Sequence, residues 1–170
     1  VIDDASLKGS DSLVTARGLA AAIGRRDYDL VIAGTESTDG YAGVMPQMLA
    51  ELLGVPALTY ATQVTASNGE ITIHRQTNTG YEVVEASLPA VVSVTAGVVE
   101  PRYPTFKGIM DAKKKEIEEL SAADLGLDTP VLQTVSNVEP APEREAGVKV
   151  EDEGEAHLKI IEILEQKKVI

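Results

Sequence analysis

The residues best suited to chemistry in this 170-residue chain lie between Gly34 and Met45. This segment, GTESTDGYAGVM, follows an apolar run over residues 29–33 and precedes a helical pattern that ends at Leu53. A strand that leads through a glycine-containing loop into a helix brings backbone N–H groups and the positive end of the helix together, and such an arrangement binds phosphate. An ordinary strand–helix connection without a ligand has the same pattern, so the residues alone leave both interpretations open.

The chain offers little else for catalysis or for metal binding. It contains no Cys, which excludes a disulfide framework and a thiolate metal site. Its two histidines, His74 and His157, lie far apart in the sequence, and we expect separate surface positions for them rather than a shared metal site. We find no Ser-His-Asp set and no carboxylate pair with a spacing suited to acid–base chemistry. We therefore expect no catalytic residue and no metal.

Composition narrows the class of protein further. With 44% hydrophobic residues, the chain can build the core of one domain. Its formal net charge of −12 argues against nucleic acid and anionic membrane surfaces as partners, because both would repel it. No apolar run approaches the roughly 18 residues of a membrane span, and no signal peptide is visible. We expect a cytoplasmic location.

Helical and strand patterns alternate in the first third of the chain. Ser10-Asp11 is a typical helix start, and a stripe of apolar residues then continues to Arg25 and Arg26, which suit a helix C-terminus. A strand over residues 29–33 and a helix over residues 43–53, ended by Gly54, follow. This order predicts an α/β fold with parallel strands covered by helices.

Between residues 57 and 97 the hydrophobic period changes to two. Asn68-Gly69 predicts a hairpin, residues 78–80 predict a second, and residues 89–94 form another apolar strand pattern. We expect a β-ribbon inserted into the α/β sheet.

Residues 100–115 form a stiff approach followed by a helix. Pro101 and Pro104 fix the backbone, and a helical pattern starts near Thr105. Phe106, the only Phe of the chain, allows two interpretations. It is a packed core residue, or it is an exposed anchor for a partner protein.

The remaining residues predict a short strand over 116–120, a capped turn over 121–125 and a strand over 131–138. From Glu139 prolines and charges replace the periodic pattern, which indicates an extended arm, and an apolar-striped helix begins near Glu155. We divide the chain into an α/β domain, residues 1–138, and an arm, residues 139–170. The helix of the arm must bury its apolar face, and a partner subunit is one place for it.

Three strings resemble the β subunits of electron transfer flavoproteins, the FixA-like family. They are DLVIAGTESTDGYAGVMPQMLAELLGVP, LPAVVSV and VEPRYPTFKGIMDAKKKEIEEL. The resemblance runs from about Gly9 to the C-terminus and includes DLG at residues 124–126 and AGVKV at residues 146–150. Family β subunits are longer at the N-terminus, so the resemblance implies that roughly their first third, with its first strand, has no counterpart here.

The resemblance implies a Rossmann-like, adenine nucleotide alpha hydrolase-like domain in an electron carrier rather than an enzyme. The family pairs β with an α subunit that holds FAD, and β binds AMP without chemistry. The heterodimer takes electrons from dehydrogenases, such as the acyl-CoA dehydrogenases of fatty acid oxidation, to the respiratory chain through a quinone oxidoreductase. Two alternatives stay open: an electron-bifurcating relative with a second FAD in β, and a stand-alone adenine-nucleotide-binding regulatory domain.

The resemblance places the AMP loop on the segment already chosen from its residues. Several family members bind the phosphate with Asn-Gln-Thr side chains. The matching positions in this chain are Gly43, Val44 and Met45, so backbone N–H groups would make the contacts. Hydroxyl groups of the same loop would assist. The cofactor-binding residues we expect are Gly34, Thr35, Glu36, Ser37, Thr38, Asp39, Gly40, Tyr41, Ala42, Gly43, Val44 and Met45.

The resemblance also implies a docking segment over about residues 94–116. In the family an apolar side chain, usually Leu, inserts at the position of Phe106 into a pocket of the dehydrogenase. Because Phe is larger than Leu, we expect a pocket of different shape. The docking residues we expect are Arg102, Tyr103, Pro104, Thr105, Phe106, Lys107, Gly108, Ile109 and Met110.

Overall fold

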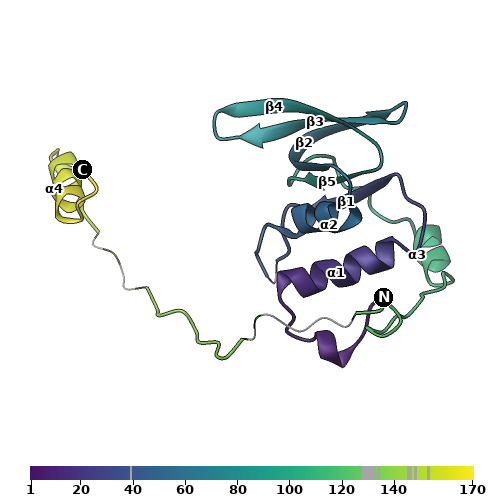
Figure 1. The fold of residues 1–170 in the computed structure, drawn as a ribbon. Coiled ribbons are helices and arrows are strands. Elements are labelled where there is room, and N and C mark those ends of the chain that lie inside the picture. The colour runs from purple at the N-terminus through teal and green to yellow at the C-terminus, as the bar shows by residue number, and fades with distance from the viewer. Residues whose placement is uncertain (39, 128–132, 134, 145–146, 148, 153) are drawn as a thin grey trace. The chain divides into compact units, whose positions relative to one another are not determined.

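The computed structural model describes every residue except 39, 128–132, 134, 145–146, 148 and 153 (Figure 1). The chain divides into two compact units, residues Val1–Val135 and Ser136–Ile170. Each unit is described by itself.

The first unit is built on one five-stranded sheet. Its strands are β1 (Leu30–Gly34), β2 (Ala57–Ser67), β3 (Glu70–Thr77), β4 (Gly80–Ser87) and β5 (Ala90–Val94), in the spatial order β1-β5-β2-β3-β4. β1, β5 and β2 are parallel, whereas β2, β3 and β4 are antiparallel. The predicted α/β class and the inserted ribbon are confirmed.

Both predicted hairpins form. Asn68 and Gly69 have φ values of 53° and 81°, the left-handed backbone that a two-residue hairpin turn needs. Thr77 pairs with Gly80 across the second turn. On the ribbon, His74 stacks on Tyr81 with ring centroids 4.3 Å apart, so His74 is half-buried by a neighbour.

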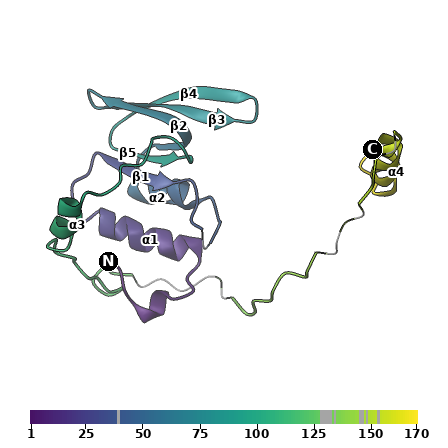
Figure 2. The same cartoon turned by 180° about the vertical axis from the view of Figure 1, so that it is seen from behind.

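Two helices cover one face of the sheet, as Figures 1 and 2 show: α1 (Ser12–Ile23) and α2 (Met45–Leu53). Because side chains alternate along a strand, Val91 of β5 meets Ala20 of α1 and Leu49 of α2, whereas Val92 points to the opposite face. The core cluster on that opposite face consists of Leu58, Ala61, Ile71, Ile73, Ala90 and Val92.

Among the described strands, β1 lies at one end of the sheet and pairs with β5. Its Ile32 is on the face away from the helices, and 65% of this residue is exposed. The short 3-10 helix η1 (Ala5–Leu7) precedes α1, and α3 (Phe106–Ala112) follows β5.

The strand predicted over residues 116–120 is wrong. The chain there forms one isolated bridge, between Leu120 and Ile2, and residues 116–119 are exposed. Without a neighbouring strand, residues 116–119 gain no ladder of hydrogen bonds. The capped turn that follows is confirmed, because the Asp124 carboxylate accepts hydrogen bonds from the Ser121 N–H (2.8 Å) and hydroxyl (2.6 Å).

The second unit contains the predicted final helix, α4 (Ala156–Gln166). Asp152 accepts hydrogen bonds from the N–H groups of Gly154 (2.8 Å) and Ala156 (3.2 Å) and so begins the helix. Much of the strand predicted over residues 131–138 lies outside the described residues, and the described ones, 133 and 135–138, are not in a strand. Among the helices that the structure describes, none is long and apolar enough to cross a membrane.

Candidate functional site

A cleft of about 410 Å³ lies at the carboxyl end of β1, where the predicted loop begins. Such a volume lies within the usual range for small-molecule sites. The cleft brings together four of the predicted cofactor-binding residues, Gly34, Glu36, Ser37 and Met45, with two residues of α1 that the sequence did not suggest. Its lining residues are Thr15, Leu19, Ala33, Gly34, Glu36, Ser37 and Met45.

The two residues from α1 had a weak signal in the sequence. Thr15 and Leu19 are four residues apart and so share a helix face, next to the apolar stripe that packs on the sheet. That spacing shows that they lie together, but only the packing of α1 beside β1 places them at this cleft.

The backbone of the loop is tightly folded before α2. Tyr41 and Gly43 have φ values of 50° and 64°, and the Tyr41 N–H donates a hydrogen bond to the Ser37 carbonyl at 3.1 Å. The predicted helix therefore starts two residues late, at Met45, because left-handed Gly43 cannot belong to it. Thr35 donates its hydroxyl proton to the Val94 carbonyl (3.1 Å), so this hydroxyl joins the ends of β1 and β5.

The two helix starts beside the loop differ in their caps. Asp11 caps α1, since its carboxylate accepts hydrogen bonds from the Leu13 and Val14 N–H groups, both at 2.9 Å. Val44 makes no side-chain cap on α2. Pro46 has no N–H, so the first turn of α2 offers the N–H groups of Met45 and Gln47 to an anion, whereas α1 already has an anion in Asp11.

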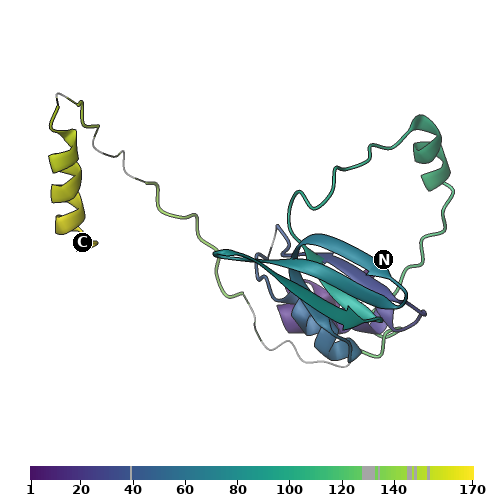
Figure 3. The same ribbon diagram turned by 90° about the horizontal axis from the view of Figure 1, so that it is seen from above.

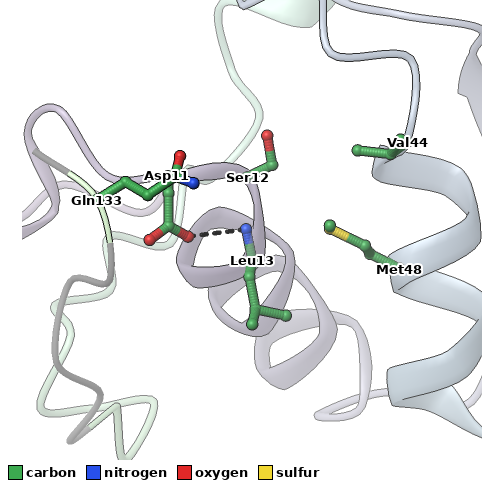
Figure 4. A pocket seen from close by; sticks show the side chains of 6 residues that line it. All are labelled: Asp11, Ser12, Leu13, Val44, Met48 and Gln133. Carbon is green, nitrogen blue, oxygen red and sulfur yellow. Dashed lines mark hydrogen bonds between the residues drawn. The ribbon is translucent and has the colours of Figure 1, made fainter. Parts of the chain in front are cut away.

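A second cleft, of about 340 Å³, separates the starts of α1 and α2 (Figure 4). In Figure 4 the Asp11 carboxylate binds the Leu13 N–H, with Val44 and Met48 of α2 on the other side. The Asp11 carboxylate, fixed by its hydrogen bonds to α1, would repel a phosphate in this cleft. The lining residues are Asp11, Ser12, Leu13, Val44, Met48 and Gln133.

Glu36 opposes an anion at the β1 cleft. Its Oε2 atom lies 3.5 Å from the position that a Cβ on residue 43 would take, so the carboxylate lies close to the loop backbone. The Glu36 carboxylate would repel a phosphate bound at the start of α2 unless the side chain turned away.

The predicted docking residues form an exposed segment around α3. Phe106 is 80% exposed, Tyr103 is 88% exposed, and no residue of α3 is buried. Thr105 caps the helix, with its hydroxyl oxygen accepting a hydrogen bond from the Gly108 N–H at 3.2 Å. The structure thus contradicts the interpretation of Phe106 as a core residue.

Parallel strands with helices packed on them and a cleft beyond the carboxyl end of β1 define a Rossmann-like α/β domain. The family model described as "Electron transfer flavoprotein domain" matches residues 1–125. The chain therefore belongs to the electron transfer flavoprotein family.

Similar proteins from distant organisms are named as β subunits of electron transfer flavoproteins. The chain is 43% identical to that of Mycobacterium bovis over 99% of its own length, 40% identical to that of Bos taurus over 89%, and 33% identical to that of Megasphaera elsdenii over 100%. The matched regions make up 66%, 59% and 69% of these three relatives, so the chain spans about two thirds of their length.

Proposed function

We propose that this chain serves as the β subunit of an electron transfer flavoprotein and carries no redox centre of its own. The observation that carries the proposal is the identity of 33–43% with β subunits over nearly the whole chain. An α subunit would hold the FAD, and electrons would pass from flavin dehydrogenases, such as acyl-CoA dehydrogenases, to a quinone oxidoreductase. This chain would bind a nucleotide and dock the donor.

The cleft at the end of β1 suits an adenylate such as AMP. Leu19 and Met45 offer apolar surface to a base, Ser37 offers a hydroxyl, and the uncapped start of α2 offers N–H groups to a phosphate. An FAD would add a flavin and a ribityl chain, which extend beyond a cleft of about 410 Å³. We therefore favour AMP over the electron-bifurcating alternative with a second FAD.

The first test is to co-express the chain with its α subunit, purify the complex, and identify the released nucleotides by chromatography. One AMP and one FAD per heterodimer are expected. Two FAD per heterodimer would support electron bifurcation, and a stable monomer with nucleotide but no α subunit would support the regulatory domain.

Glu36→Gln tests where the phosphate binds. Removing one unit charge about 4 Å from a phosphate is worth about 1 kcal/mol in water. Calorimetric titration of the nucleotide-free heterodimer with AMP should therefore show roughly fivefold tighter binding. Glu51→Gln removes the same charge from an exposed position of α2 outside the cleft and should change nothing. Weaker binding in Glu36→Gln would instead give this carboxylate a direct contact with the ligand.

We assign donor docking to the segment around α3. A rigid aromatic side chain at 80% exposure loses little entropy when it enters a pocket, and Lys107 beside it suits an acidic rim.

We assign the α-subunit contact to the arm, residues 139–170. In the described structure, apolar residues of α4 such as Leu158, Ile160 and Ile161 are exposed to solvent. An apolar helix face that large requires a partner surface. Deleting residues 155–170 should reduce the yield of heterodimer on gel filtration, and an unchanged yield would place the contact elsewhere.

A further inference from the structure

The docking segment is an arch of chain attached at two points. In Figure 3, α3 (green) lies away from the sheet, on chain that leaves β5 and returns toward the N-terminal residues. Among the residues that the structure describes, the hydrogen bonds formed by residues 99–117 all stay within that range. Its orientation therefore depends on the two attachment points.

The attachment on the β5 side is made by Thr95. Its N–H and its hydroxyl both donate to the Ala61 carbonyl, at 2.9 and 3.2 Å. Ala61 is fully buried in β2, so this end is fixed to the sheet.

The second attachment is made by Glu118. Its Oε1 atom accepts a hydrogen bond from the Arg25 guanidinium at 2.8 Å, and its Oε2 atom accepts one from Arg26 at 3.1 Å. Both arginines directly follow the C-terminus of α1, the helix that packs on the sheet through Ala20. Two positive charges on one carboxylate, from residues more than 90 positions earlier, join the arch to the helical layer.

We propose that Glu118 is a positioning residue that orients the docking segment for its electron donor. The proposal rests on the docking function assigned to α3. With Glu118 held, the arch samples fewer orientations before it meets the donor, so less conformational entropy is lost on docking. Hydrogen bonds from Arg25 and then Arg26 lower the pKa of Glu118, which keeps the carboxylate charged.

Two further hydrogen bonds also hold this end of the arch. The Asp3 N–H donates to the Leu120 carbonyl at 3.0 Å, and the Ala122 N–H donates to the Asp4 carboxylate at 2.9 Å. These bonds remain when Glu118 is neutralised, so the effect of a substitution is an orientation effect of modest size rather than unfolding.

The test is steady-state electron transfer from a donor dehydrogenase to the purified heterodimer carrying Glu118→Gln. The KM for the heterodimer should rise about two- to fivefold, the range for an exposed ion pair, with kcat and the flavin spectrum unchanged. Glu119→Gln is the matched control, since it removes the same charge at the neighbouring residue. The Glu119 side chain forms no ion pair in the described structure. Equal changes in the two variants would indicate a simple charge effect and overturn the proposal.

A double variant separates positioning from a second contact. If Glu118 acts through the arch, Phe106→Ala combined with Glu118→Gln should be no worse than Phe106→Ala alone, because the side chain being positioned is gone. If the KM increases of the two single variants multiplied in the double variant, Glu118 would contact the donor independently of Phe106, and the proposal would be overturned. An unchanged KM in Glu118→Gln, with a raised KM in Phe106→Ala, would overturn positioning and leave docking intact. No effect of Phe106→Ala would overturn both.

Discussion

Two loops leave the carboxyl ends of neighbouring parallel strands in this molecule and take opposite courses. The loop after β1 folds back against α1 and α2 and lines a cleft, whereas the segment after β5 extends from the sheet and exposes Phe106. The two begin side by side, because Gly34 pairs with Val94 and the Thr35 hydroxyl bonds the Val94 carbonyl. At this end of the sheet we therefore propose an inward site for a small molecule and an outward site for a protein.

The difference follows from local residues. Left-handed positions at Tyr41 and Gly43 turn the first loop inward, whereas Pro101 and Pro104 keep the second one extended. The first loop depends on the packed helices for its shape. The second depends on its attachments, so we expect its stability to change little when its exposed side chains are replaced.

The largest expected effect is on the free energy of unfolding, and it tests whether α2 depends on packing more than α3 does. Leu49 of α2 is 4% exposed, so Leu49→Ala should lower the free energy of unfolding by about 2–5 kcal/mol and loosen the loop with it. Ile109→Ala in the exposed α3 should cost less than about 0.5 kcal/mol. Urea unfolding midpoints measure both. Equal losses would mean that α3 packs as firmly as α2 does.

The next effect concerns the outward site. Phe106→Ala should raise the KM for electron transfer from a dehydrogenase by roughly thirtyfold, equivalent to about 2 kcal/mol for an anchoring aromatic residue, with unfolding unchanged. Ile117→Ala, at an exposed apolar residue of the arch that is not among the predicted docking residues 102–110, is the control and should have little effect. If the two variants behaved alike, the segment after β5 would lose its distinction as a docking site.

The inward site should be sensitive to its backbone. At φ 64°, Gly43→Ala forces an L-residue into the left-handed region, which costs about 1–2 kcal/mol, and AMP content should fall. Gly69→Ala, which places the same backbone strain at a left-handed position (φ 81°) in the hairpin between β2 and β3, is the control. Nucleotide content is measured after extraction. Retained AMP in Gly43→Ala would place the ligand away from this loop.

The smallest effect concerns the loss of stability in acid and the carboxylate of Asp4, which caps η1 and binds the Ala122 N–H. Hydrogen bonds from the Ser6 hydroxyl and N–H, and from the Ala122 N–H, lower the pKa of Asp4 from its ordinary 3.8. Since the folded pKa is lowered, this stabilisation is present above about pH 4 and is lost as pH falls through the folded value. Asp4→Asn should therefore flatten the dependence of the unfolding midpoint on pH below about pH 4. An unchanged slope would contradict this role.

Local sequence patterns predicted the elements correctly where neighbouring residues alone determine the backbone conformation. Asn68-Gly69 dictates a hairpin and Gly54 ends α2, because each conformation is decided within a few residues. The strand expected over residues 116–120 failed because a strand needs a neighbour that sequence patterns do not supply. Thr15 at the cleft and the Glu118 ion pairs were missed for the same reason, since each joins elements distant in sequence.

The position of β1 at the end of its sheet has a practical consequence. Among the described strands, β1 has a neighbour on one side, and the N–H and C=O groups of its other side can pair with a strand of another molecule, next to the exposed apolar Ile32. Concentrated stocks of this polypeptide should associate edge to edge. Ile32→Lys would place a charged side chain on this edge strand, as natural proteins do to prevent pairing with another molecule.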